Sequence, residues 1–476
     1  MTLAVNAPNE AIDALRKQWA VLEALQGGTP AMRQKKALLP QWPAEEGGAY
    51  LARLSTATLF PAYRRTVGVM SGKPFAKALA AEGVPQPWLD DADLQGVSLH
   101  SFCAEMFEET FYGLAGILVD YPRVEPGRAP RTVAQVERTG ARPYLVRVRH
   151  DQILGWKTAV VGGRMQLSQL RLTETVEVDD GEYGTKPIEQ VRVLRPGSWE
   201  LWRQSDGNNK AWILYDAGTT TLKVVPFVPL YGRRRAYMIG DPPLLDLAYL
   251  NVKHWQSQSD QDTILHAARV PILSIAGMDE TPELIVGGSM AVNLGNNPDA
   301  KLVWVEHSGA AIGAGEESLR ALEEQMIQTG AELLVKKPGD RSATESSNDA
   351  EANKSDLQRM AENFEDAIDQ ALHLMAQFAG TGQGGSVQLF SDYGAATLSD
   401  ASASLIKELN GAGLLSKGTT IEELKRRGVL SAEVDAEEEA AKVAEEGPPL
   451  GMMGEFGLGP DGKPLPKDDE DEAEKA

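Results

Sequence analysis

The sequence predicts an α+β protein in which helical and strand-rich blocks follow one another along the chain. Apolar residues recur at three- and four-residue spacing before about residue 119 and again after residue 240, which is the period of amphipathic helices. Between about residues 143 and 237, short β-branched and aromatic runs are separated by Gly, Asp and Pro, as in antiparallel strands. Separate blocks of helices and strands are typical of the α+β class.

Three helical stretches are expected ahead of the strands. The first ends at Gly27 and Gly28, and its apolar residues share one helical face: Ile12, Leu15, Trp19, Leu22 and Leu25. The second covers residues 49–72 and is interrupted near Pro61, which lacks the N–H that a helix interior needs. The third covers residues 99–119, although its last part, GLAGILVDYP, is equally consistent with a buried strand.

The strand-rich block is expected to form an antiparallel sheet or a small β-domain that ends near Tyr237. Six runs have the composition of strands: PYLVRVR, QLSQLRLTETVEV, IEQVRVLR, WELWRQS, AWILYDAG and KVVPFVPLYG.

A long helix is expected over residues 241–269, with Asp241 as its N-cap, Pro242 at its first position and its end before Pro271. At 1.5 Å per residue it would be about 40 Å long. Its middle contains one large apolar residue, Trp255. A helix that is polar on nearly every side cannot pack fully inside its own domain, so we expect it to project into solvent or to pack against copies of itself.

A short insert and a second long helix follow. The insert, from Pro271 to Ala311, contains the strand-like pieces PILSIAG and KLVWVEH around Gly- and Asn-rich turns. The second helix, residues 316–336, is expected to run antiparallel to the first because the two are close in sequence.

A third long helix is expected after a polar loop, KKPGDRSATESSNDAEANKS. It falls within residues 345–397, together with a strand, SVQLFS, and its apolar seam closes at Gly380. The seam consists of Leu357, Met360, Phe364, Ile368, Leu372, Met375 and Phe378. Residues 398–446 indicate short helices, and residues 447–476 are rich in Gly, Pro and acidic residues, which predicts a disordered tail.

Composition excludes several classes of protein. The 476 residues contain 47 Lys and Arg against 68 Asp and Glu, a formal charge of −21, which disfavours a protein that grips DNA phosphates along a broad surface. The single cysteine, Cys103, rules out a disulfide framework and fits a reducing compartment. No run approaches 18 apolar residues and no signal peptide is evident, so the sequence predicts a soluble intracellular protein without a membrane partner.

The sequence contains no convincing catalytic motif. GTGQGG at residues 380–385 follows a helix and precedes a strand, the reverse of the dinucleotide fingerprint, and is better interpreted as a helix stop. GVMSGKP at residues 68–74 is too short for a phosphate loop and has Pro74 where Ser or Thr should bind magnesium. Acidic clusters at residues 90–93 and 179–182 are more typical of turns than of cation sites. The sequence therefore predicts no enzyme, no cofactor and no metal.

Basic residues occur at two points of interest. Arg233, Arg234 and Arg235 lie at a strand end and would suit an inter-subunit ion pair or a phosphate contact. A second set lies at the loop between two long helices, where contact with nucleic acid or plain solvation are both consistent with the sequence: Lys336, Lys337 and Arg341.

The order of these segments, together with specific strings, resembles portal proteins of tailed bacteriophages. The strings are AYRRTVGVMSGKPF, GVSLHSFCAEMFEETFYGLAGILVDYP, VVPFVPLYG, DPPLLDLAYLNVKHWQSQSDQDTILHAARVPIL and EHSGAAIGAGEESLRALEEQM. They are similar to a phage portal-like family long described only as a domain of unknown function. The resemblance covers roughly residues 45–445 and leaves the tail outside.

The resemblance implies a portal-type subunit with a helical and β-rich wing, a two-helix stem, a small α/β clip, a long spine helix and a helical crown. It assigns the wing to residues 1–240, the stem to residues 241–269 and 316–336, and the clip to residues 270–315. It assigns the tunnel loop to residues 337–344, the wing spine and strand to residues 345–397, and the crown to residues 398–446. Lys336, Lys337 and Arg341 would then face DNA in the channel, as would a polar face of the stem: Lys253, His254, Gln256, Gln258 and Asp260.

The function that the resemblance implies is structural. A portal is a ring, usually of about twelve copies, at one capsid vertex of the virion, assembled in the host bacterial cytoplasm. Double-stranded DNA is packaged and ejected through it, and its partners are the major capsid or scaffolding protein, the terminase motor and the head-tail adaptor. The negative charge agrees independently, because DNA must slide through a conduit and tight phosphate binding would stop it.

Two other functions stay open on the sequence alone. Another head-tail connector or adaptor of the virion would share the non-enzymatic character, but such proteins are usually shorter and lack two long helices around an insert. A metal-dependent nuclease would need carboxylates or histidines brought together, and no spacing in the sequence suggests it.

Overall fold

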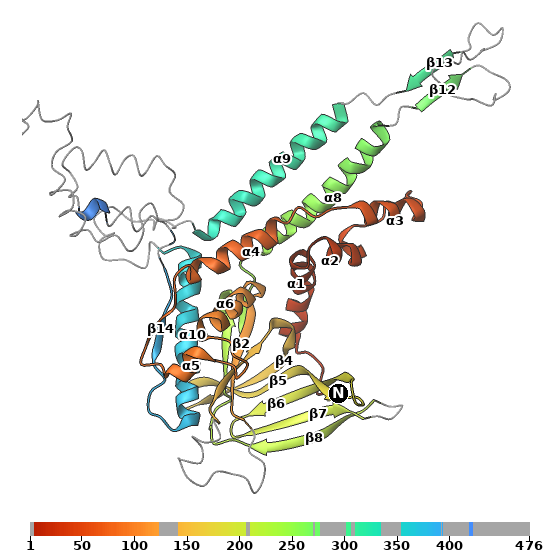
Figure 1. Ribbon diagram of the computed structural model, residues 1–476. Coiled ribbons are helices and arrows are strands. Elements are labelled where there is room, and N and C mark those ends of the chain that lie inside the picture. The colour runs from red at the N-terminus through yellow and green to blue at the C-terminus, as the bar shows by residue number, and fades with distance from the viewer. Residues whose placement is uncertain are drawn as a thin grey trace, which may run out of the picture. The chain divides into compact units, whose positions relative to one another are not determined.

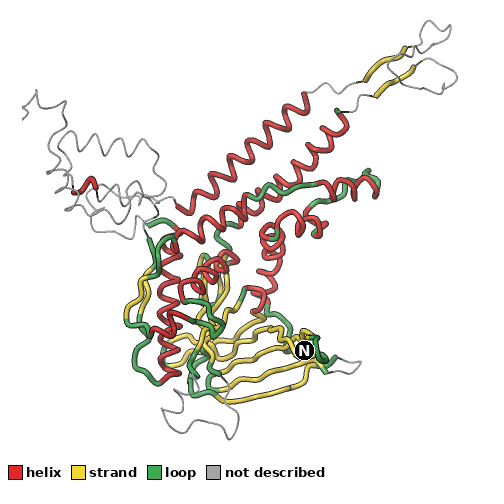
Figure 2. The backbone as a smooth tube through the Cα atoms, in the orientation of Figure 1, coloured by secondary structure: helices red, strands yellow, loops and turns green. Residues whose placement is uncertain are grey.

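The computed structural model describes residues 4–122, 141–205, 210–269, 272–276, 301–305, 310–334, 354–391, 393 and 418–421. The chain divides into two compact units, Met1–Ser391 and Asp392–Ala476. All elements named below belong to the first unit, which mixes helices and antiparallel sheets as the α+β prediction requires (Figure 1, Figure 2). Apart from one helical turn at residues 418–421, the expected crown lies outside the described residues, as does the whole expected tail.

The N-terminal helices largely follow the predicted pattern. They are α1 (Glu10–Gln26), α2 (Gly28–Gln34), α3 (Gly47–Thr56), α4 (Ala62–Gly72), α5 (Gln86–Asp90) and α6 (Leu99–Glu109). Asn9 caps α1 by accepting a hydrogen bond from the Ile12 N–H, and the five predicted apolar residues of α1 are buried. The second predicted stretch is two helices, α3 and α4, separated around Pro61 as expected.

The third predicted helix is half strand. Helix α6 ends at Glu109, a short 3₁₀ turn follows, and β2 (Leu114–Asp120) begins after Gly113, whose φ of 94° breaks the helix. The strand interpretation of GLAGILVDYP is therefore confirmed, and the helical one is wrong. β2 is buried along nearly its whole length because it is the central strand of a three-stranded antiparallel sheet. Its neighbours are β3 (Tyr144–Val148) and β9 (Phe227–Tyr231).

The strand-rich block also forms a five-stranded antiparallel sheet in simple chain order. Its strands are β4 (Ile153–Val161), β5 (Arg164–Asp179), β6 (Thr185–Arg195), β7 (Ser198–Gln204) and β8 (Trp212–Thr219). Three two-stranded sheets complete the described part: β1 (Ala80–Glu82) with β14 (Ser386–Gln388), β10 (Arg233–Ala236) with β11 (Ile239–Asp241), and β12 (Ile272–Ala276) with β13 (Lys301–Val305).

Helices α8 (Leu245–Ala268) and α9 (Ala310–Ala331) lie side by side, with β12 and β13 in the segment that joins them (Figure 1). Their contacts run in opposite order, because His254 meets Glu323 and Gln261 meets Ile312, so the predicted antiparallel arrangement is confirmed. Among the described residues, no helix is both long and apolar enough to cross a membrane.

Both helix starts differ from the prediction. Asp241 is the last residue of β11 and pairs with Arg235, so it does not cap α8, whose first intrahelical bond runs from Ala248 N–H to Leu244 O. Helix α9 begins at Ala310, ahead of the expected residue 316, and so includes Gly313 and Gly315. At Gly315 a Cβ would meet the end of the Gln261 side chain, so glycine lets α8 approach closely without displacing that side chain.

Helix α10 (Asp356–Ala379) confirms the predicted seam. Ser355 and Gln358 form a capping box at its start, and Gly380 ends it in the left-handed conformation. Leu357, Met360, Phe364, Ile368, Leu372 and Met375 are buried, whereas Phe378 is half-buried. The helix packs on β2 and β9, and Phe364 meets Phe75 and Phe107 edge to face. Residues 345–353, where the helix was expected to begin, lie outside the described ranges.

Candidate functional site

The polar middle of α8 is the first candidate, and most of it is buried within its own chain. Asn251, His254, Trp255, Ser259 and Gln261 are each less than 5% exposed. Helices α1, α3, α4 and α9 all contact α8. The expectation that the polar middle of α8 lacks partners within its own chain is therefore wrong. The polar residues are accommodated because they bind backbone and side-chain groups of segments far away in sequence.

Asn251 joins α8 to the start of α4. Its Oδ1 accepts a hydrogen bond from the Tyr63 N–H at 2.9 Å, and its Nδ2 donates to the Phe60 carbonyl at 2.8 Å. Helix α4 has no capping side chain of its own, since Pro61 occupies the N-cap position. Asn251 thus satisfies an N–H at the open end of α4 from the side of another helix.

An arm of the chain, residues 35–61, lies on α8 (Figure 1). Arg53 of the arm makes two hydrogen bonds to Glu45, at 2.7 and 2.8 Å, and its guanidinium stacks 4.2 Å from the ring of Trp42. These hydrogen bonds lower the pKa of Glu45. Arg53 also reaches α8, where Ser259 Oγ is 3.5 Å away and Asp260 Oδ1 is 3.8 Å away. The arm therefore covers part of the polar face of α8, for which the sequence indicates no partner within the chain.

The five residues expected on one channel-facing stripe of α8 have different surroundings. Lys253 is exposed, whereas His254 is buried between Glu323 of α9, 3.3 Å from its Nε2, and the ring of Phe60. Gln256 donates to the Leu38 carbonyl of the arm, and Asp260 faces Arg53. Gln258 donates to Asp262 on the same helix. The structure therefore does not bring the five together on a single exposed face.

The three consecutive arginines form β10 and are exposed. Arg233 lies 3.3 Å from Asp356 at the start of α10, and Arg235 pairs with Asp241. The guanidinium of Arg234 stacks 5.3 Å from the ring of Tyr231. Each arginine thus has an interaction within the chain. The remaining predicted basic residues, Lys336, Lys337 and Arg341, lie outside the described residues.

A buried histidine is a second notable group. His150 is 2% exposed and its Nδ1 lies 2.9 Å from Glu109, while its Nε2 lies 3.3 Å from Glu23 of α1. Its ring stacks on Tyr112 with a centroid distance of 3.6 Å. Burial lowers the pKa of His150, but the hydrogen bonds to Glu109 and Glu23 outweigh burial and the net pKa is raised. The hydrogen bond to His150 in turn lowers the pKa of Glu23.

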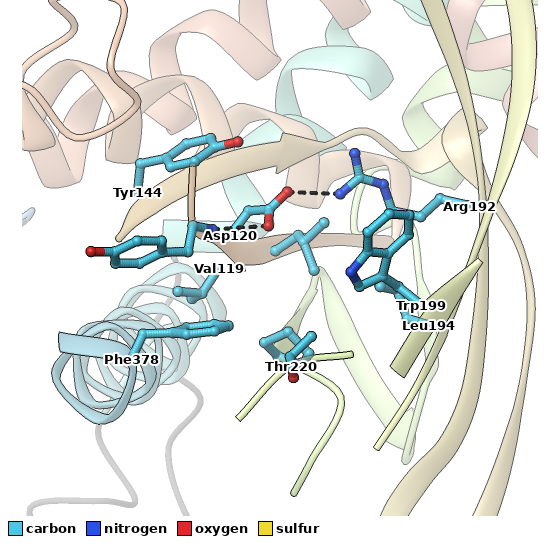
Figure 3. Close-up of a pocket in the computed structure, with 11 residues that line it drawn as sticks. Val119, Asp120, Tyr144, Arg192, Leu194, Trp199, Thr220 and Phe378 are labelled. Carbon is cyan, nitrogen blue, oxygen red and sulfur yellow. Dashed lines mark hydrogen bonds and ion pairs between the residues drawn. The ribbon is translucent and has the colours of Figure 1, made fainter. Parts of the chain in front are cut away.

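A pocket of about 280 Å³ lies where the two larger sheets approach the end of α10 (Figure 3). Its lining includes Tyr121, Tyr144, Trp199 and Phe378, all half-buried, and the ion pair between Asp120 and Arg192. No motif pointed to this pocket, because its residues come from β2, β3, β6, β7 and α10.

Metal chemistry finds no support among the described residues, where no group of three His, Cys, Asp or Glu side chains could hold an ion. The first acidic cluster serves a turn, as expected: Asp93 accepts hydrogen bonds from the N–H groups of Gln95 and Val97, and Asp91 pairs with Arg142. Cys103 is buried, which raises the pKa of its thiol and leaves it unreactive.

Comparison with known proteins gives limited matches. A family model described as "Domain of unknown function (DUF4055)" matches residues 243–379, which include α8, α9 and α10. No curated protein matches the chain. Solved structures with some likeness are a chain in the virion of a native gene transfer agent (GTA) particle and chains in the necks of the native and the empty particle, computed with C12 and C6 symmetry. Each is 14% identical and covers 77% of this chain, and the match spans 89%, 89% and 90% of the other chain. The TM-scores of 0.36, 0.36 and 0.35 are too low to identify a fold.

Proposed function

We propose that this chain is the subunit of a phage portal ring, the channel through which DNA enters and leaves a capsid. The observation that carries the proposal is the pair of antiparallel helices α8 and α9, joined by a segment with a two-stranded sheet and followed by α10. This is the order of stem, clip, stem and spine that the portal resemblance implies. The formal charge of −21 supports a conduit, since a negatively charged wall lets DNA slide.

The regions of the proposed portal follow from this order. Residues 1–240 form the wing, α8 and α9 the stem, residues 270–315 contain the clip and residues 398–446 form the crown. We propose that the ring nucleates capsid assembly and that its clip contacts the terminase motor and then the head-tail adaptor. In the polar face of the stem, Lys253 is the exposed residue and so the best candidate to line the channel.

The proposed DNA contact is the tunnel loop, residues 337–344, with Lys336 just before it. Replacing Lys336, Lys337 and Arg341 together by Ala should reduce the DNA packaged or retained in particles, because these cations would touch phosphates transiently. Ring assembly should be unchanged, and it serves as the control for folding. Unchanged packaged DNA in this variant would overturn the tunnel-loop assignment.

The proposed ring is tested by the mass of the purified chain. Twelve copies of the 51.5-kDa chain weigh about 620 kDa. Mass photometry should detect a species of this order beside free subunits, and dilution should interconvert the two. A single species near the subunit mass would contradict the proposal if it is found at every concentration and also after co-expression with the capsid protein.

A further inference from the structure

Strand β5 lies between β4 and β6 in the five-stranded sheet (Figure 1) and is longer than either. It extends past β6 at its start, because its pairing with β6 begins only at Leu170. It extends past β4 at its end, because its pairing with β4 stops at Leu172. Each end of β5 therefore belongs to a two-stranded ribbon, one made with β4 and the other with β6, and the two ribbons point in opposite directions.

The ribbon made with β4, residues 157–166, is basic and is called the basic ribbon below. Its sequence, KTAVVGGRMQ, contains two basic residues and no acidic one, and both Lys157 and Arg164 are exposed. The two glycines in its turn have φ of 59° and 77°, which is typical of a tight two-residue hairpin. Large apolar side chains are also exposed at this tip, by 70%, 56% and 56%: Val160, Val161 and Met165.

The ribbon made with β6, residues 175–189, is acidic and is called the acidic ribbon below. Its sequence, TVEVDDGEYGTKPIE, contains five acidic residues and one basic residue, a formal charge of −4. The basic residue, Lys186, lies 3.8 Å from Asp180. Tyr183 at the tip is 94% exposed. Pro187 lacks an N–H, so the outer edge of this ribbon is a poor template for another strand, and contacts with a partner would use side chains.

We propose that the basic ribbon of one copy of this chain docks on the acidic ribbon of the next copy. Lys157 and Arg164 face the carboxylates of the acidic ribbon, and the Tyr183 ring covers the exposed apolar side chains of the basic tip. The ribbons cannot meet within one chain, because the 16 residues of β5 separate them by about 50 Å at about 3.3 Å per residue.

The contact joins two unlike surfaces, so it repeats from copy to copy and closes into a ring at a suitable rotation. The proposal therefore rests on the proposed ring and assigns it a contact between neighbouring wings. Two cations are few beside a formal charge of −21 per chain, so net repulsion between copies remains. Complementary charge of this kind acts mainly by fixing the orientation and register of the partners.

Crosslinking between two cysteine variants of the full chain tests the contact. Ala159→Cys lies in the basic ribbon and Thr185→Cys in the acidic ribbon, and both positions are exposed. The native Cys103 is 0% exposed and should not react. When the two variants are mixed before assembly, a short bismaleimide should give a covalent dimer, whereas either variant alone should give none.

Ala217→Cys is the matched control, because Ala217 is an exposed alanine on β8, at the other edge of the sheet from β4. Mixed with Thr185→Cys, it should give at least about five-fold less dimer than Ala159→Cys does. Far-ultraviolet circular dichroism and the unfolding midpoint establish that the variants are folded. Equal crosslinking from Ala217→Cys, or dimers from Ala159→Cys alone, would overturn the head-to-tail contact.

Charge reversal tests the recognition itself. Adding Lys157→Glu and Arg164→Glu to the Ala159→Cys chain should slow crosslinking at least about five-fold, because like charges then meet. Adding Asp179→Lys and Asp180→Lys to the other chain should restore the rate, which damage to either fold would not do. An unchanged rate after the first reversal, or no recovery after the second, would overturn the role of charge in this contact.

Electron microscopy of the same mixtures separates this contact from the ring. Rings that form without the crosslink between residues 159 and 185 would overturn the ribbon contact and leave the portal proposal standing. Crosslinked chains that grow into open filaments would support the ribbon contact and contradict the portal ring, since a head-to-tail contact closes only at a suitable rotation.

Discussion

Buried polar side chains connect distant segments of this chain. Asn251 of α8 binds the Phe60 carbonyl and the Tyr63 N–H on either side of Pro61, and His150 binds carboxylates of α1 and of the last residue of α6. A buried polar group that loses its partner costs more than an ordinary surface contact contributes. These residues are therefore expected to matter for stability although neither belongs to an apolar core.

Replacing Asn251 by Leu should destabilise the protein by about 1–3 kcal/mol, because the buried Tyr63 N–H and the Phe60 carbonyl would lose their partner. Urea unfolding followed by tryptophan fluorescence measures the change. Gln258→Leu is the control on the same helix, since Gln258 makes an exposed hydrogen bond to Asp262, four residues on, and its loss should cost far less. Equal effects of the two substitutions would contradict the role given to Asn251.

Stability should fall as pH rises through the folded-state pKa of His150. That pKa is raised above the ordinary 6.5, so the folded chain binds the proton more tightly than the unfolded chain. The stabilisation is complete below pH 6.5 and is lost at higher pH. The groups that face the ring are Glu23, Glu109, Tyr112 and Asp151.

The measurement is the free energy of unfolding of the wild type and of His150→Phe between about pH 6 and pH 9. The lowered pKa of Glu23 acts at acidic pH and burial raises the pKa of Tyr112, so neither group titrates in this window. The wild type should lose stability relative to the variant as pH rises. A constant difference between the two across the window would show that folding does not raise the pKa of His150.

No pattern in the sequence indicates that Asn251 and His150 connect distant segments of the chain. The partner groups of Asn251 are 188 and 191 residues away, and Glu23 is 127 residues from His150. No periodicity or motif reports on such pairs, because they exist only after the elements have packed. For the same reason the aromatic pocket had no signal in the sequence.

Among the elements, the long helices were predicted best and their ends worst. The seam and the final glycine of α10 are local features, so they could be read directly from residue spacing. The start of α8 was misjudged because Asp241 and Pro242 make a good local cap signal, yet Asp241 belongs to β11 and pairs with Arg235. The start of α9 was placed too late because glycine is common in turns. Gly315 instead lies inside α9, where it faces Gln261 of α8.

Phe364→Ala tests the packing of α10. Phe364 is 3% exposed among Phe75 and Phe107, so its removal leaves a cavity and should cost about 3–5 kcal/mol. Phe378→Ala on the same helix is the matched control, because that ring is half-buried and its loss should cost clearly less. Thermal or urea unfolding of both variants measures the difference. A cost for Phe364→Ala no larger than for Phe378→Ala would contradict the proposed core.

At the scale of the whole molecule, the excess negative charge bears on assembly. Subunits that carry −21 repel one another, and salt screens this repulsion over about 10 Å at 0.1 M. Raising NaCl from about 20 to 300 mM should therefore increase the ring fraction in mass photometry. Sucrose at equal osmolality should leave the fraction unchanged. Dissociation of the ring by salt would mean that ion pairs between subunits outweigh net repulsion.

The central claim, that the chain forms a portal ring, is tested most directly by negative-stain electron microscopy of the purified protein. End-on views should be averaged without imposed symmetry. The account predicts rings with a central channel and about twelve repeating units. Compact particles of about 50 kDa without a channel, at concentrations and salt that favour assembly, would contradict it.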